Sequence, residues 1–396
     1  MEVVGRLERY RIFRPKDPNA EPVYRDAMAR IDWFNAFIGI SMFEKYVNLI
    51  NFRYLYGAAT LTVFFYFVCE TTYYYRDNVE NILMSVTTVG FAVQMVSKQY
   101  TYAFKRKRIV DIHEMNLEYL NFDVIQDPAI QLAIRKSAIL SHILIKMTLV
   151  GYLVLVILIA TVPVILGFMM GEVLLPFGFE VIHSTSWTAF WINYGFQLSC
   201  TYFTGLVSSS SDALFILNVF TACEQIDAIL ALLAELNLMA RSNMPEQLLS
   251  DQLTKILRLH QHHQQYIRKL ENVFDCYFLI AIAMLCFCMS LSLAAFTLIN
   301  WYIGLAVFCF SSAQIFYMCF LGTHLESKNE QLMLEVGSFA WYALNVHDQK
   351  RAVLLLAATQ TPVTLSAVMD ILNVETYLKI HKTVYSFWMF LLQVKV

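Results

Sequence analysis

Three histidines stand close together in the sequence His260-Gln-His262-His263. On a helix, His260 and His263 would share one face, and two imidazoles on one face can bind a metal if further ligands complete the shell. No cysteine or carboxylate stands near enough to do so. Cys286 and Cys288 are two positions apart on an expected helix and point to different faces. We therefore expect a solvated helix at the histidines, with no metal and no cofactor.

Motifs of other chemistries are missing from the sequence. No nucleophile and base stand at a recognisable spacing, and no Gly-rich loop could cradle a phosphate. No basic face with interleaved aromatic residues indicates a nucleic-acid partner. We predict that the chain is not an enzyme and binds no nucleic acid. Its eight cysteines lie mostly in apolar runs and are expected to be free thiols.

The composition indicates a multi-pass membrane protein. The chain has 396 residues, 58% of them apolar, and a mean hydropathy of +0.52, which is more apolar than ordinary soluble domains. The fold class predicted is all-α, with seven transmembrane helices in the plasma membrane and lipid around them. The expected spans lie near residues 55–72, 82–103, 139–170, 187–220, 273–299, 303–321 and 375–396.

Between the spans, polar segments complete the organisation. Residues 1–53 should form a cytoplasmic N-terminus with an interfacial or re-entrant helix around Trp33–Phe43. Residues 54–222 should hold the first four spans, with an extracellular loop at 171–186. Residues 223–272 should project into the cytosol as helices, 273–321 should hold two spans, and 322–374 should return to the cytosol before the last helix at 375–396.

The orientation follows from the basic residues. The N-terminal segment and the run Lys105-Arg-Lys-Arg108 are rich in Lys and Arg, which favour the cytosolic side. The loop at 171–186 carries Glu172, Glu180 and His183 but neither Lys nor Arg. We therefore expect the N-terminus inside the cell and the C-terminus outside, which is the reverse of a G-protein-coupled receptor.

An apolar site for a small molecule is expected in the extracellular half of the bundle. The second, third, fourth and sixth spans supply aromatic and small polar side chains there, and such pockets bind small apolar ligands. The candidate ligand-binding residues are Thr87, Phe91, Gly151, Tyr152, Leu155, Tyr194, Leu198, Tyr302, Leu305 and Phe308.

The last eighty or so residues carry an ordered set of short motifs. These are Cys319-x-x-Gly322, Glu326 to Glu330, Phe339-x-Trp341-Tyr342, Thr361-Pro362-Val-Thr-Leu-Ser, Val374-Glu-Thr-Tyr-Leu-Lys-Ile and Tyr385-Ser-Phe387. In this order and spacing they resemble the C-terminal signature of insect odorant receptors. The rest of the chain is similar to that family only in length and hydropathy.

The resemblance implies an odorant-gated, non-selective cation channel, in which an odorant-specific subunit forms a heterotetramer with a co-receptor. It implies that Phe339, Trp341 and Tyr342 belong to a cytosolic subunit anchor. It also implies that the last helix lines the pore, with Phe390, Gln393 and Val394 at the outer pore and gate. Thr383, Phe387, Phe390 and Val394 share one face of that helix by spacing.

The sequence also bears on three alternatives: the co-receptor, a gustatory receptor channel and a small-molecule transporter. The short stretch at 223–272 favours the odorant-specific subunit, because the co-receptor is expected to carry a longer insertion. A gustatory receptor channel is the near alternative, but of its expected last-helix motif only Gln393 agrees. A small-molecule transporter is disfavoured, since no pair of Gly/Pro-broken helices stands in corresponding halves of the chain.

Overall fold

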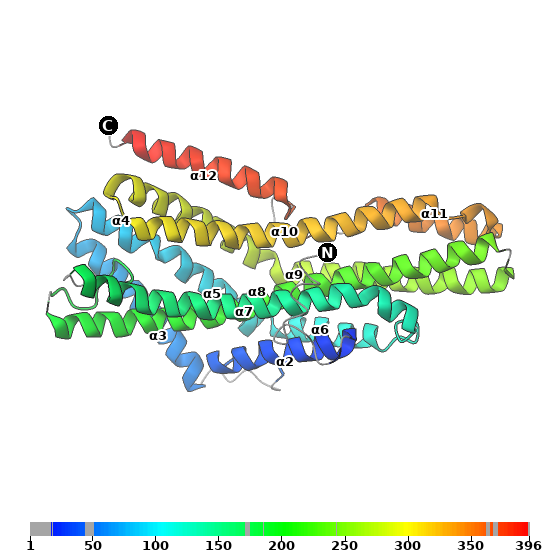
Figure 1. Ribbon diagram of the computed structural model, residues 1–396, viewed down its shortest axis with the longest axis horizontal. Helices are drawn as coiled ribbons and strands as arrows, with labels where there is room; N and C mark the ends of the chain where they lie inside the picture. The colour runs from blue at the N-terminus through cyan, green and yellow to red at the C-terminus, as the bar shows by residue number, and fades with distance from the viewer. Residues whose placement is uncertain are drawn as a thin grey trace.

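The computed structural model describes residues 17, 19–43, 51–170, 175–184, 186–242, 244–361, 365–366 and 371–394. Over these residues the chain is helical, and its extended pairing is a single bridge between Ser366 and Ile371. The molecule is elongated, with its helices running mostly along the long axis (Figure 1). The prediction of an all-α fold is confirmed.

Four long helices form the body of the molecule: α7 (Pro128–Met170), α8 (Trp187–Arg241), α9 (Glu246–Ile299) and α10 (Tyr302–Ser338). The segments α8 and α9 continue beyond the apolar bundle as a helical hairpin, at the right-hand end of Figure 1. This hairpin corresponds to the polar segment at 223–272. At the opposite end, Asn300 adopts a left-handed conformation with φ of 54° and turns the chain from α9 into α10.

Five helices of the described chain are long and apolar enough to cross a membrane: α3 (Phe52–Tyr74), α7, α8, α9 and α10. The expected second span is divided into α4 (Val79–Thr87) and α5 (Val89–Phe104). At the junction, the hydroxyls of Thr87 and Thr88 donate to the carbonyls of Leu83 and Ser85, both at 2.7 Å. Such back-bonding bends helices, and here the bend lies within the segment expected to be the second span.

The N-terminal helix also differs from the expectation. It begins well before Trp33, because α2 covers Ala20–Ile38 and ends at Gly39, whose φ is 86°. Tyr24, Met28 and Ile31 are buried on one face, and α2 packs against α7 and α8. Trp33 stays exposed on the other face. The helix α6 (Arg106–Leu120) follows α5 and contributes further buried residues to the same core.

The last helix, α12 (Val374–Val394), lies along one side of the bundle and packs against α9 and α10 (Figure 1). Its first turns carry Glu375, Lys379 and Lys382. The segment before it is held on α10, since Val374 N donates to Thr323 Oγ1 at 2.9 Å. Gly322 makes that approach possible: a Cβ at this position would lie 1.8 Å from the carbonyl oxygen of Leu372.

We predict that Gly322→Ala lowers the thermal stability of the protein. Alanine normally stabilises a helix relative to glycine by up to about 1 kcal/mol, but the new methyl group would collide with backbone, which costs about 1–3 kcal/mol. Gly337→Ala on the same helix is the matched control, because its Cβ would lie 4.0 Å from the nearest atom. The measurement is the midpoint of thermal aggregation in detergent. Equal midpoints for both variants would contradict the packing described.

Candidate functional site

A cavity of about 420 Å³ lies among α3, α5, α7, α8 and α10 and extends to the loop at 175–184. This volume falls in the range of sites for small molecules. The wall is mainly apolar and aromatic. Its larger apolar residues are Leu61, Phe64, Phe91, Met95, Leu155, Val156, Ile159, Phe177, Phe179, Phe203 and Phe310.

The outer end of the cavity is covered by the loop at 175–184. Phe179 of this loop is fully buried and packs edge-on against Phe64, with 5.0 Å between ring centroids. The amide of Gln197 on α8 holds the loop backbone, because its Nε2 donates to the carbonyl of Phe179 at 2.6 Å. It also accepts from the backbone N–H of Phe177 at 3.0 Å. The loop is therefore a fixed part of the cavity wall.

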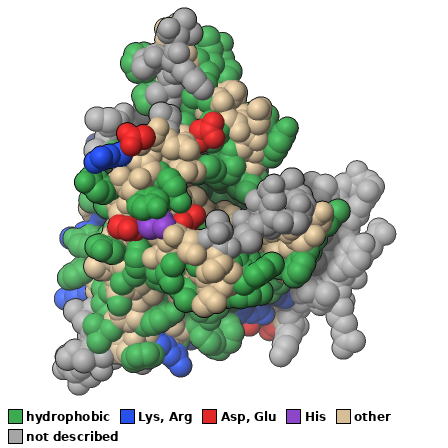
Figure 2. All heavy atoms as spheres, turned by 90° about the vertical axis from the view of Figure 1, so that its left-hand side faces the viewer, with side chains coloured by type: hydrophobic (Ala, Val, Ile, Leu, Met, Phe, Trp, Pro, Cys, Tyr) green, Lys and Arg blue, Asp and Glu red, His purple; other side chains and the backbone are tan. Residues whose placement is uncertain are grey.

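Polar contacts of His183 hold the same loop to α3. His183 Nε2 lies 2.8 Å from Glu70 Oε2, and His183 Nδ1 lies 3.1 Å from Glu180 Oε2. The ring of Tyr74 stacks on the imidazole at 4.2 Å between centroids. Figure 2 views the molecule from this end and shows a histidine between acidic side chains on the surface.

The inner end of the cavity rests on a buried ion pair. Lys98 on α5 and Asp212 on α8 are both 0% exposed, and Lys98 Nζ lies 3.1 Å from Asp212 Oδ1. Tyr277 on α9 donates to the same oxygen at 2.9 Å, and Tyr152 on α7 donates to Oδ2. Gln314 on α10 donates through Nε2 to the Tyr152 hydroxyl at 2.6 Å. Five helices are thus joined through one carboxylate.

Of the ten candidate ligand-binding residues, three line the cavity: Phe91, Tyr152 and Leu155. The other seven lie outside its lining. They are Thr87, which donates to Leu83; Tyr194, which donates to Ala160; Leu198; Phe308, which packs near α12; and Gly151, Tyr302 and Leu305, which are exposed.

Several residues of the cavity were missed from the sequence. Helix α3 contributes Phe64, and the loop at 175–184 contributes Phe177 and Phe179. The alternation Phe177-Gly-Phe179 in this loop was the available signal. Lys98 lies in the expected second span and is buried against Asp212, a partner that the sequence analysis missed. A single carboxylate inside an apolar run signals a buried partner.

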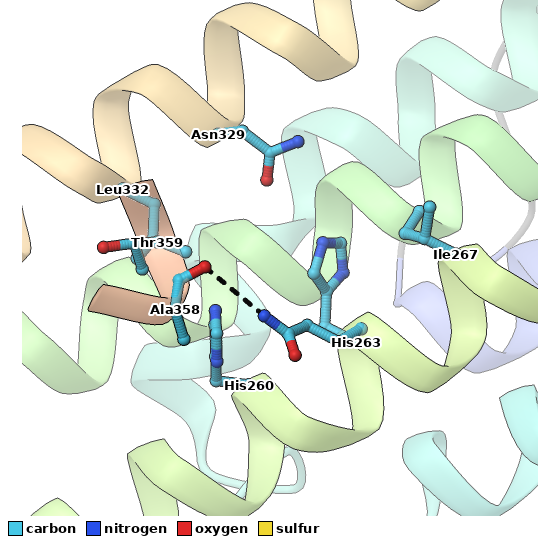
Figure 3. A pocket seen from close by; sticks show the side chains of 8 residues that line it. His260, His263, Ile267, Asn329, Leu332, Ala358 and Thr359 are labelled. Carbon is cyan, nitrogen blue, oxygen red and sulfur yellow. Dashed lines mark hydrogen bonds between the residues drawn. The ribbon is translucent and has the colours of Figure 1, made fainter. Parts of the chain in front are cut away.

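The three histidines are not on a solvated helix as expected. His260 and His263 are buried and line a small cavity where α9, α10 and α11 (Val346–Gln360) meet (Figure 3). His262 points away and packs on Tyr119 and Phe122. Burial lowers the pKa of His263 to about 3, so this imidazole is neutral at pH 7. Within the described chain no three His, Cys, Asp or Glu residues form a metal-binding group.

The expected subunit-anchor residues divide into two kinds. Phe339 is buried in the core of the same chain, and the backbone N–H of Ala340 donates to Asn237 Oδ1 on α8 at 3.0 Å. Trp341 and Tyr342 lie in the short helix η1 (Trp341–Ala343) and are 46% and 70% exposed. The turn therefore directs two aromatic side chains outward.

On α12, one face is packed and the other is open. Val384 is buried against Leu285, Met289, Ile315 and Cys319, and His381 Nε2 lies 2.9 Å from Ser312 Oγ. On the opposite face, the expected pore residues Phe390 and Gln393 are exposed, as are Phe387 and Thr383. Val394 lies on the helix, but its side chain is outside the described part of the structure.

Comparison with known proteins identifies the class. The fold is similar to that of the insect olfactory receptor OR5 from Machilis hrabei in complex with eugenol, with a TM-score of 0.74 and 14% identity over 93% of this chain and 98% of that chain. A second structure of OR5 gives a TM-score of 0.71 and 15% identity, with the same coverage. A sequence model described as "7tm Odorant receptor" matches residues 78–385. The chain belongs to the odorant receptor family, whose members are ligand-gated channels and not enzymes.

We predict that Lys98→Met destabilises the protein by about 3–5 kcal/mol, since it leaves the Asp212 carboxylate buried without its cation. Adding Asp212→Asn should restore part of the loss, because the amide oxygen still accepts from one tyrosine, the NH₂ group can donate to the other hydroxyl, and no charge remains. The thermal midpoint in detergent is the readout. Lys136→Met, at an exposed position of α7, is the control. Additive losses in the double variant would show that the two side chains do not act as a pair.

Proposed function

We propose that this chain is the odorant-binding subunit of a non-selective cation channel, assembled with a co-receptor in the plasma membrane. The observation that carries the proposal is the mainly apolar cavity of about 420 Å³ in a chain of the odorant receptor family. A cavity of this character gains free energy from burying a small volatile molecule. OR5, which shares the fold, has been solved in complex with the odorant eugenol.

The proposed topology has seven spans with the N-terminus inside the cell. The five apolar helices α3, α7, α8, α9 and α10 supply five of them. The pair α4–α5 and the helix α12 supply the other two. The excess of Lys and Arg on the side of Lys105 to Arg108 supports this orientation.

Gating couples the cavity to α12. Phe91 lines the cavity, and its ring also packs against the cluster that contains Leu285, Met289, Ile315 and Val384. Because Val384 belongs to α12, a ligand that displaces Phe91 also disturbs the packing of this helix against α9 and α10. A ligand shifts the equilibrium only by its differential affinity for the open state. In the proposed mechanism, that difference arises at Phe91 and moves α12 outward.

The open face of α12 is the proposed pore lining. Phe387 and Phe390 are exposed in the single chain, at 43% and 55%, and their ring centroids lie 6.3 Å apart. In a tetramer, equivalent apolar side chains would surround the axis and exclude water from a narrow passage. Gln393 and Val394 continue this face, and the exposed Trp341 and Tyr342 suit contacts between subunits in the cytosol.

The test of the function is whole-cell current in cells that express the chain with and without the co-receptor, exposed to a panel of small volatile compounds that includes eugenol. We expect an odorant-evoked cation current only with both subunits, because the pore requires both. Equal current from this chain alone would make it a self-sufficient channel. No current with any compound, in cells where the chain reaches the surface, would contradict the proposal.

A second prediction concerns the gate. Phe390→Ala should raise the current measured before odorant is added several-fold, because a smaller side chain weakens the dewetted constriction. Val394→Ala should act in the same direction. Leu378→Ala, exposed near the other end of α12, is the control and should leave the resting current unchanged. Unchanged resting current and unchanged odorant gating in both gate variants would remove these residues from the gate.

A further inference from the structure

The amide of Gln314 lies at the inner end of the cavity and has one unused polar atom. The side chain is 4% exposed and lines the cavity beside Tyr152. Its Nε2 donates to the Tyr152 hydroxyl at 2.6 Å. Within the part of the chain that the structure describes, its Oε1 has no hydrogen-bond partner. An unpaired, buried acceptor thus belongs to a side chain of the cavity wall.

The hydrogen-bond chain decides which end of the amide is unused. Lysine can only donate and an ionised carboxylate can only accept, so Asp212 must receive its hydrogen bonds. Tyr152 has one hydroxyl proton, and it gives this proton to Asp212 Oδ2. The Tyr152 oxygen must therefore accept from Gln314, which only the NH₂ end can supply. The hydrogen bonds therefore fix the orientation of the Gln314 amide, and its carbonyl oxygen is left without a donor among the described residues.

A second unpaired group belongs to another residue of the same cavity wall. Gln94 lines the cavity from α5, one helical turn before Lys98 on the same face, and is 2% exposed. Its Nε2 has no hydrogen-bond partner among the described residues. Other polar groups of the wall are already committed: Thr88 Oγ1 donates to Ser85 at 2.7 Å, and Thr201 Oγ1 donates to Gln197 at 2.8 Å. Among the described lining residues, Gln314 Oε1 is thus an unused acceptor and Gln94 Nε2 is an unused donor.

We propose that the cavity selects small apolar alcohols or phenols, whose hydroxyl donates to Gln314 Oε1. Ethers, esters and ketones can only accept, so they leave the Gln314 carbonyl unpaired, and a site built to bond a hydroxyl discriminates strongly against such analogues. An ammonium group would donate too, but its charge is costly in an apolar cavity. The inference rests on the proposed odorant-binding function and names the ligand class.

Isomeric ligand pairs provide the test. One pair is n-octanol and heptyl methyl ether; the other is para-ethylphenol and para-methylanisole. In each pair the two compounds have the same composition, and the ether lacks the hydroxyl donor. In cells that express this chain with the co-receptor, we expect the hydroxyl compound of at least one pair to reach half-maximal current at a concentration about tenfold lower than its isomer.

The variant Gln314→Met keeps the length of the side chain and removes its hydrogen-bonding atoms. It should reduce the preference to within about twofold while the ether response remains. Gln331→Met, at an exposed position of the same helix α10 outside the cavity, should keep the full preference. If Gln314→Met fails to reach the cell surface, Tyr152→Phe replaces it. Loss of the Tyr152 hydroxyl removes the acceptor that orients the Gln314 amide, so the preference for the hydroxyl compound should also weaken.

Two results would overturn the ligand class: equal or better responses to both ethers in the wild-type channel, or a preference that persists unchanged in Gln314→Met. If neither pair evokes current while other volatile compounds do, the ligand class is also wrong and the odorant-binding function stands. If no compound of the wider panel evokes current, the proposed function itself fails. The two failures are therefore distinguishable.

Discussion

The buried carboxylate of Asp212 constrains how five helices are arranged. A charge removed from water must be paired and hydrogen-bonded, and here the partners come from different helices: Lys98 from α5, Tyr152 from α7 and Tyr277 from α9. Gln314 on α10 joins through Tyr152. Rotation of any of these helices would break a hydrogen bond in a place that water does not reach. The cluster therefore fixes helix orientation at the inner end of the cavity.

The cavity combines two kinds of recognition. Its apolar wall favours burial of any molecule of suitable size, because the hydrophobic effect has no direction. The polar inner end adds direction, since its donors and acceptors are held by the ion pair below them. Phe91 lines the cavity and also packs against the cluster of Leu285 and Val384 that holds α12. In the proposed mechanism, recognition and gating thus meet at one aromatic side chain.

The sequence predicted features that are local. Long apolar runs determine the helices, and Asn300 marks the turn between α9 and α10. The face that each residue presents was harder to predict, because neighbouring positions on a helix differ by about 100°. Tyr152 therefore points into the cavity while Gly151 is exposed. Contacts between distant segments were out of reach of any local pattern.

The same limit explains the other differences. The burial of Phe179 depends on Gln197, which holds the loop from α8. The burial of His260 and His263 depends on α10 and α11, which cover that face of α9. The motif Cys319-x-x-Gly322 was recognised as a family signature, but its physical reason is the carbonyl of Leu372 lying against the glycine. A pattern can mark such a position without saying what fills the space beside it.

The uninterrupted length of α8 has a mechanical consequence. Its 55 residues make a rod of about 80 Å. Gln197 holds the loop at 175–184, Ser208 lines the cavity, and Asn237 accepts a hydrogen bond from the backbone beside Trp341 near the C-terminal tip of α8. No proline interrupts the helix. A small tilt of such a rod at the cavity would therefore become its largest displacement at that distant tip.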